Sequence, residues 1–225
     1  MESLPKRRES GPRGSAEAWL DAAYDLLIST GVDSIRIVPL AETLNLARTS
    51  FYWFFKDRSA LLEALLDRWR SKNTDTLVRQ TRLYAESITE AVFNVFDCWL
   101  DPKLFDSHFE FSVRSWALQS PEVAVEIHHA DTVRIEALTT MFLRFGFDPL
   151  AADVRARTIY LTQIGYISMK SEEDLGTRMT RIPDYVAIFT GSAALPRELD
   201  RFFARHGYAP AGEVQSAPIK RASKT

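Results

Sequence analysis

Apolar side chains recur along most of this chain at the three- and four-residue spacing of an amphipathic helix. The first run follows Ser15, stops at Gly31 and contains Ala18, Trp19, Ala22, Ala23, Leu26 and Leu27. A serine just before a helix accepts a hydrogen bond from a free backbone amide, and a glycine commonly ends a helix. The pattern therefore predicts a helix between Ser15 and Gly31.

The same spacing predicts further helices across most of the remaining sequence. One begins after Asp57, whose carboxylate can cap it, and the others span residues 37–44, 48–54, 87–100, 103–118, 121–145, 149–169, 183–190 and 196–206. Pro102, Pro121 and Pro149 each follow an Asp or a Ser, as expected of a proline in the first turn of a helix. No segment alternates apolar and polar residues as a strand does. The sequence therefore predicts an all-α fold.

Both ends of the chain lack this periodicity. Residues 1–14 are rich in Gly, Pro and Ser, and their charged residues are Lys6, Arg7, Arg8 and Arg13 against Glu2 and Glu9. The last residues contain Pro210, Gly212 and Pro218. We expect a disordered basic arm at residues 1–14 and a flexible tail at residues 208–225.

Composition and charge narrow the class of protein. With 46% hydrophobic residues, 26% charged residues and a net charge of -2, the chain has the composition of an ordinary globular protein. Cys98 is the single cysteine and lies in an apolar run, which predicts a buried structural thiol rather than a disulfide. The N-terminus has no apolar signal core, and no apolar stretch reaches the roughly 18–20 residues that cross a bilayer. We therefore expect a cytoplasmic protein that does not enter a membrane.

Residues 37–62 have the features of a helix-turn-helix, in which one short helix braces another that can enter the major groove of DNA. Ala41 is small enough for close helix contact, and Asn45 tolerates the left-handed backbone of a tight turn. The inward anchors are Leu40, Leu44, Leu46, Phe51 and Phe55. The opposite face of the second helix carries Arg48, Thr49, Tyr52 and Trp53. Since a short helix does not bury its whole circumference, we expect Tyr52 and Trp53 at the surface.

The run LNLARTSFYWFFKDRSALLEALLDRW resembles the TetR family of repressors in its turn, its recognition helix and the start of the next helix. The strongest element is FYWFF, followed by KDR and a pair of leucines. The resemblance implies a helix-turn-helix DNA-binding domain at residues 15–62 and a helical effector-binding and dimerisation domain at residues 63–207. It also implies a repressor that a small-molecule effector releases from a palindromic operator in double-stranded DNA.

The resemblance further implies a set of DNA contacts. Tyr52 is expected to donate its hydroxyl to a backbone phosphate, as is Ser50 or the neighbouring Thr49. Arg48 and Trp53 stand at positions that vary within the family, and an arginine there suits the edge of a guanine. Lys56 is the next basic residue of the motif.

Three positions in the expected interface depart from the family pattern. Phe54 stands where His or Tyr is common, so one phosphate donor is missing. Arg58 replaces a lysine and keeps its charge. Arg36 stands where a Ser or Thr usually caps the first of the two helices, so we expect Ser34 to cap it and Arg36 to reach phosphate. Two interpretations of the basic arm stay open. It contacts phosphates or a minor groove of the DNA, or its charges only keep the protein soluble.

Aromatic residues in the second half of the chain are candidates for the lining of an effector cavity. The candidate set is Phe96, Trp99, Phe109, Trp116, His129, Tyr160 and Gln163. A mostly apolar lining with a few polar groups is typical of a small-molecule site, although the same residues also fit a solid core. His128 and His129 are adjacent and point about 100° apart on a helix, so we expect no metal site and no cofactor.

In the TetR family the last two long helices form the homodimer, which here implies residues 149–169 and 183–190. A symmetric pair would hold its two recognition helices about 34–36 Å apart or somewhat more, and an effector would change that distance. Two alternatives stay open. One is a helical ligand-binding protein or enzyme without DNA binding, although the sequence shows no nucleophile paired with a base. The other is an activator of the same fold.

Overall fold

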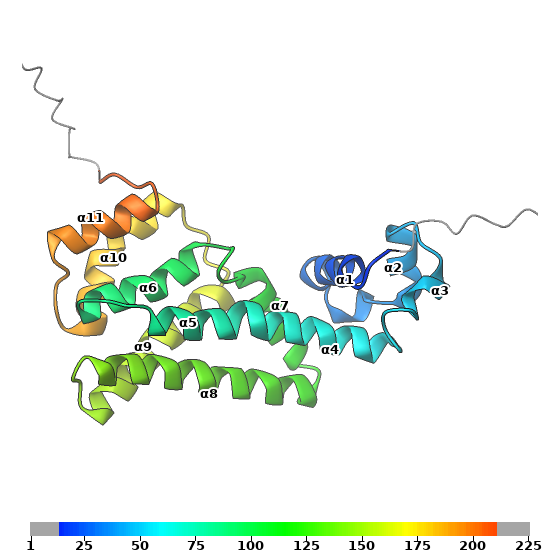
Figure 1. The fold of residues 1–225 in the computed structure, drawn as a ribbon, viewed down its shortest axis with the longest axis horizontal. Helices are drawn as coiled ribbons and strands as arrows, with labels where there is room; N and C mark the ends of the chain where they lie inside the picture. The colour runs from blue at the N-terminus through cyan, green and yellow to red at the C-terminus, as the bar shows by residue number, and fades with distance from the viewer. Residues whose placement is uncertain (1–13, 211–225) are drawn as a thin grey trace, which may run out of the picture.

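The computed structural model describes residues 14–210, so the predictions for most of the arm and of the tail lie outside the described residues. Within this range the chain forms helices and no strand (Figure 1), and the all-α prediction is confirmed. A small head holds α1 (Ala16–Thr30), a short helical turn η1 (Val32–Ser34), α2 (Ile37–Thr43) and α3 (Arg48–Phe51). The start of the long α4 joins this head to a larger helical body (Figure 1).

The head follows the predicted start and stop signals closely. Ser15 caps α1 by accepting a hydrogen bond from the amide of Ala18 at 3.1 Å, and Gly31 ends the helix with φ of 88°. Asn45 adopts the left-handed backbone with φ of 51°, which closes the turn between α2 and α3. Asp57 caps α4 (Arg58–Trp69) through the amide of Ala60 at 2.9 Å. These four predictions are confirmed.

A long helical rod leads from the head into the body. Helix α4 continues through a π-helical segment, Arg70–Asp75, into α5 (Thr76–Arg82). The sequence pattern predicted the helix after Asp57 but no helix beyond Trp69. The π-helical turn buries the polar side chains of Asn73 and Thr74, so the usual apolar stripe is interrupted there. The expected domain boundary between residues 62 and 63 falls inside α4, so the two parts share one continuous helix.

The body contains α6 (Ile88–Leu100), α7 (Ser107–Ala117), α8 (Pro121–Arg144), α9 (Pro149–Ser168), α10 (Leu175–Thr190) and α11 (Pro196–Arg205). Ser87, Ser120 and Asp148 cap α6, α8 and α9, and Pro121 and Pro149 occupy first turns as predicted. Cys98 is fully buried in the core of the body, and burial raises the pKa of its thiol to about 12.

Three predicted features of the body were wrong. Helix α7 begins at Ser107 rather than at residue 103, because Pro102 lies in a turn and Asp106 provides the cap. Helix α10 begins at Leu175 rather than at Pro183, because Asp174 caps it and Pro183 is accommodated inside it. Tyr208, expected in the flexible tail, packs edge-on against Phe203 at 5.1 Å between ring centroids.

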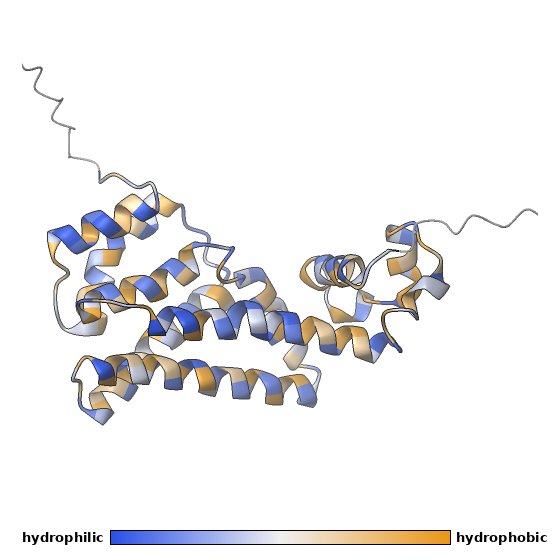
Figure 2. Ribbon diagram, viewed as in Figure 1, coloured by the Kyte–Doolittle hydropathy of each residue, from blue (hydrophilic) through white to orange (hydrophobic). Residues whose placement is uncertain are grey.

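Apolar side chains form two clusters, and one of them crosses from the head into the body. Most helices carry apolar and polar residues side by side (Figure 2). The head cluster around Trp19 also includes Phe109 and Val113 of α7 and Val123 of α8. Tyr24 of α1 meets Phe109 edge-on at 5.0 Å. The orientation of the head is therefore tied to α7 and α8. Between residues 14 and 210 no helix is long and apolar enough to span a membrane.

Candidate nucleic-acid interface and internal cavity

Helix α3 is anchored to the head by two phenylalanines. Phe51 is fully buried and meets Trp19 edge-on at 5.2 Å, while Phe55 packs against Phe51 at 5.6 Å. Ala41 of α2 is also buried, so α2 and α3 approach closely. This packing fixes which side of α3 faces outward.

The outward side carries the residues that the sequence placed there. We call Arg48 and Thr49 of α3, with Tyr52 and Trp53 of the turn that follows it, the recognition face. The helix predicted over residues 48–54 ends at Phe51, and residues 52–54 continue as a turn. Tyr52 is 47% exposed and Trp53 is 60% exposed, so the prediction that both lie at the surface is confirmed. Arg48 and Thr49 are exposed as well, and an Nη atom of Arg48 donates to the Tyr52 hydroxyl at 3.3 Å. The four side chains present hydrogen-bond donors, one positive charge and two aromatic rings on a single small surface.

Two of the predicted DNA-contact residues form hydrogen bonds within the protein. Ser50 is buried, and its hydroxyl donates to the carbonyl of Ala47 at 2.7 Å. Arg58 donates to the carbonyls of Ile35 at 2.6 Å and Val32 at 2.8 Å, which ties the start of α4 to the segment before α2. Of the Ser50 and Thr49 pair, only Thr49 is therefore exposed for a phosphate.

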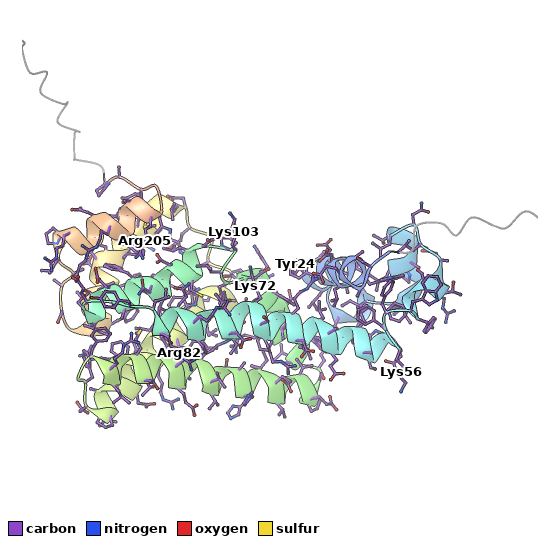
Figure 3. All side chains as sticks on the ribbon, viewed as in Figure 1. Tyr24, Lys56, Lys72, Arg82, Lys103 and Arg205 are labelled. Carbon is purple, nitrogen blue, oxygen red and sulfur yellow. The ribbon has the colours of Figure 1, made fainter. Side chains whose placement is uncertain are left out.

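The remaining predicted residues surround the recognition face. Phe54 is 36% exposed, and Arg36 and Lys56 are exposed. Lys56 lies at the head end of α4, far from the helices of the body (Figure 3). The expected cap by Ser34 is wrong, because its hydroxyl donates to the carbonyl of Gly31 and no side chain caps α2.

A buried charge cluster lies where the rod passes through the body. Arg134 of α8 and Glu110 of α7 are both fully buried, and two guanidinium nitrogens donate to the carboxylate at 2.7 and 3.1 Å. Trp69 and Asn73 of the rod donate to the same carboxylate at 2.8 and 2.9 Å. Burial alone would raise the pKa of Glu110, but the charge and hydrogen bonds of Arg134, with help from Arg114, lower it to about 2.

Tyr160, a predicted cavity residue, belongs to this cluster. It is buried, its hydroxyl donates to Asp131 at 2.5 Å, and it accepts hydrogen bonds from Arg114 and Arg134 at 3.0 Å each. The cluster therefore joins the rod to α7, α8 and α9 through buried and partly buried hydrogen bonds.

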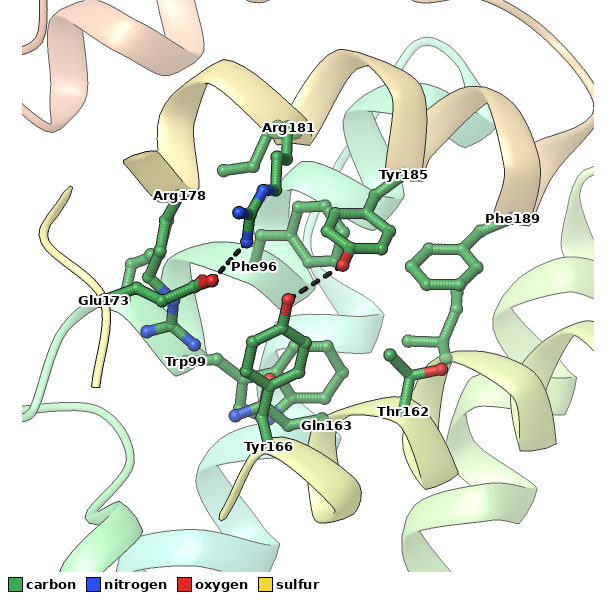
Figure 4. A pocket seen from close by; sticks show the side chains of 13 residues that line it. Phe96, Trp99, Thr162, Gln163, Tyr166, Glu173, Arg178, Arg181, Tyr185 and Phe189 are labelled. Atoms are coloured by element: carbon green, nitrogen blue, oxygen red, sulfur yellow. Dashed lines mark hydrogen bonds and ion pairs between the residues drawn. The ribbon is translucent and has the colours of Figure 1, made fainter. Parts of the chain in front are cut away.

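A separate cavity opens between α6, α9 and α10 (Figure 4), with an empty volume of about 530 Å³ including its mouth. Three predicted residues, Phe96, Trp99 and Gln163, line it. The other four do not. Phe109 is in the head cluster, Tyr160 is in the charge cluster, Trp116 packs against the head cluster, and His129 is exposed on α8.

The walls that the sequence analysis missed come mostly from α10. Its first half contributes Arg178, Arg181 and Ile182, and its second half contributes Tyr185 and Phe189. Two polar contacts join residues of the cavity lining (Figure 4). The hydroxyls of Tyr166 and Tyr185 are 2.8 Å apart, and Glu173 pairs with Arg181. The sequence pattern predicts this helix only from residue 183, so it does not indicate that residues before 183 line a cavity.

Comparisons with known proteins agree with this architecture. No family model matches the chain. An HTH-type transcriptional repressor of Mycobacterium tuberculosis is 32% identical over 74 residues, which is 32% of this chain and 28% of that protein. The class D tetracycline repressor protein of Escherichia coli is 40% identical over 53 residues, or 24% of each protein. The matched stretch thus spans about a quarter of the length of these relatives.

Solved structures extend the likeness to most of the chain. The fatty acid degradation regulator FadR of Bacillus halodurans aligns with a TM-score of 0.59 at 16% identity, covering 82% of this chain and 98% of that one. GusR of Salmonella enterica aligns with a TM-score of 0.58 at 14% identity, with the same coverage of 82% and 98%. A regulator described as a TetR/AcrR family member gives a TM-score of 0.54 at 15% identity, covering 83% and 94%. In its fold and in the sequence of its best-matched stretch, the chain is similar to the TetR family of transcriptional regulators, as the motif around Tyr52 predicted.

Proposed function

We propose that this protein is a sequence-specific DNA-binding transcriptional regulator of the TetR type, acting as a repressor in the cytoplasm. The observation that carries the proposal is the recognition face of α3, which is exposed on a helix anchored by the buried Phe51. The names of the curated relatives support a repressor rather than an enzyme. The predicted alternative of a helical protein without DNA binding leaves this exposed face without a role.

Each residue of the recognition face has a contact that its chemistry suits. Tyr52 and Thr49 donate hydroxyl groups to backbone phosphates, and these bonds position the helix without reading sequence. Arg48 reaches the edge of a guanine, whose O6 and N7 both accept. Trp53 packs against a thymine methyl or a sugar. The contact between Arg48 and Tyr52 holds both side chains over the same surface before DNA arrives.

A homodimer would supply the second recognition helix. Leu150, Val154 and Leu161 of α9 are 73%, 53% and 60% exposed, and Ile188 of α10 is 68% exposed. Leu150, Val154 and Ile188 line one shallow hollow, so the two helices share an apolar surface. A surface of this kind is typical of a protein interface, and two-fold pairing buries it against its own copy.

An effector in the cavity between α6, α9 and α10 would then control operator binding. Helices α9 and α10 contribute both to the cavity and to the proposed dimer surface, so a ligand that spreads them changes the distance between the two heads. Such a ligand lowers the affinity for the operator by the factor by which it binds the spread conformation more tightly than the DNA-bound conformation.

Selection of bound duplexes from a random pool tests the proposal. We expect enrichment of a palindrome whose half-site centres lie about 10 base pairs apart or somewhat more, because each head reads one half-site of the major groove. Enrichment of a single, unpaired half-site would contradict the dimer. Failure to enrich any sequence would favour the ligand-binding protein without DNA binding.

A further inference from the structure

The cavity between α6, α9 and α10 has an unbalanced positive charge. Its lining contains three ionised side chains, Glu173, Arg178 and Arg181. Glu173 is engaged by Arg181, so these two charges compensate each other. Arg178 lies against the ring of Tyr166, with 5.6 Å from its guanidinium carbon to the ring centroid. Within residues 14–210, Arg178 has no carboxylate at ion-pair distance.

Two further polar groups of the lining lack partners. The indole Nε1 of Trp99 is buried and has no hydrogen-bond partner among the described residues. Gln163 is only 8% exposed, and in the same part of the chain its amide makes no hydrogen bond. A buried donor without an acceptor costs about 1–3 kcal/mol. Of the two groups, the Gln163 amide is the one that a ligand oxygen can meet, because the Trp99 Nε1 is enclosed by protein atoms.

The rest of the cavity is apolar and rich in flat rings. Phe96, Ile159, Ile182 and Phe189 provide apolar walls, and the rings of Tyr185 and Phe189 are stacked with 5.7 Å between centroids. The cavity and its open mouth together enclose about 530 Å³ of empty space. Flat aromatic walls favour a flat apolar body in the ligand.

We propose that this cavity binds a small aromatic carboxylate, with the ring system against the apolar walls that Phe96 and Phe189 form and the carboxylate on Arg178. The planar guanidinium matches a carboxylate with two parallel hydrogen bonds, which a point charge would not do. This inference rests on the proposed function in one respect, since it names the chemical class of the effector.

Arg178 lies at one end of a second hollow that reaches the head. This hollow shares Gln163, Tyr166, Glu173 and Arg178 with the cavity and continues past His108 of α7 to Ile28 of α1. A carboxylate on Arg178 therefore lies where the cavity meets this hollow. Ligand binding at Arg178 would change the charge facing α7, which packs directly against α1.

Calorimetric titration of the DNA-free protein tests the inference, with benzoate, 2-naphthoate and the uncharged 2-naphthamide as probes. We expect 2-naphthoate to bind roughly 10- to 100-fold more tightly than 2-naphthamide, the range for hydrogen bonds to a charged group. Arg178→Gln should remove this preference, and Arg178→Lys should retain part of it. Arg197→Gln, which removes the same charge from an exposed position on α11, should bind like the wild type.

Equal affinity for 2-naphthoate and 2-naphthamide would overturn the inference, as would a preference that survives in Arg178→Gln. Absence of binding by both carboxylates would also overturn it. The operator found by selection separates this failure from failure of the proposed function. A protein that binds its operator but no carboxylate refutes the effector class alone, and one that binds 2-naphthoate but no duplex refutes DNA binding alone.

Discussion

Replacement of Arg134 by methionine tests the buried charge cluster that joins the rod to α7, α8 and α9. The change removes four hydrogen bonds, to both oxygens of Glu110 at 2.7 and 3.1 Å, to Thr74 at 3.0 Å and to Tyr160 at 3.0 Å. Methionine fills much of the same volume without charge. Glu110 then stays fully buried with Arg114 as its remaining cation, at 2.9 Å.

The expected cost follows from the buried charge that is left behind. Removing one partner of a buried ion pair typically costs about 3–5 kcal/mol of unfolding free energy, because the other charge loses its compensation. Arg114 still compensates Glu110 in part, so we expect the lower end, about 3 kcal/mol. Glu110→Gln should also destabilise the protein, since it leaves Arg134 buried without a carboxylate. The double variant should cost less than the sum of the two single changes.

Urea unfolding followed by tryptophan fluorescence measures these energies, at one fixed protein concentration because dimer stability depends on it. Arg201→Met is the matched control. Arg201 of α11 pairs with Glu90 of α6 at 54% exposure, so its loss should cost under about 1 kcal/mol. A cost for Arg134→Met no larger than that of the control, or strictly additive single changes, would refute the assignment of a buried, coupled charge cluster.

Two further predictions concern acid stability and assembly. The lowered pKa of Glu110 means that its contribution to stability is present above its ordinary pKa of 4.5 and is lost as the pH falls from there towards 2, so Glu110→Gln should flatten this part of the stability curve measured by urea unfolding. An unchanged curve would show that Glu110 does not titrate on unfolding. Leu161→Arg on the proposed dimer surface should shift the protein to monomers in analytical ultracentrifugation, because it buries a charge against its own copy. Leu118→Arg, at an 87% exposed position at the end of α7, should leave the assembly unchanged, and a Leu161→Arg dimer of wild-type stability would place the interface elsewhere.

The head could be predicted from the sequence in detail because its signals are local. Ser15, Gly31, Asn45 and Asp57 each control the backbone within a few residues, and the structure uses all four as expected. The two faces of α3 also follow directly from helical spacing. Arg58 could not be predicted in the same way, because its partners are carbonyls 23 and 26 residues earlier in the chain.

The cavity was predicted only in part, for two physical reasons. An aromatic side chain on an apolar helix face has the same pattern whether it lines a cavity, as Phe96 does, or fills a core, as Phe109 does. The first half of α10 is mostly polar and is followed by Pro183, which suggested a helix start rather than a helix interior. The pattern therefore gave no sign that Arg178 lines a cavity.

The sequence pattern did not predict the buried charge cluster. Glu110 and Arg134 sit among other charged residues on their helices, and polar residues of this kind are usually at the surface. Their burial depends on the π-helical turn of the rod, which brings Asn73 and Thr74 to the same place. Only the packing of three helices around that turn reveals that these charges face inward.

The central claim is that the recognition face of α3 binds operator DNA, and the most direct test is the affinity of Tyr52→Phe for the selected duplex. This change removes a single hydroxyl from an exposed ring, so folding should be unaffected. We expect affinity to fall roughly 10- to 100-fold, as for loss of a hydrogen bond to a charged phosphate. Tyr84→Phe, at an 85% exposed position between α5 and α6, should bind like the wild type. If Tyr52→Phe and Tyr84→Phe both bind with wild-type affinity, Tyr52 does not hold a phosphate and the proposed DNA contact is wrong.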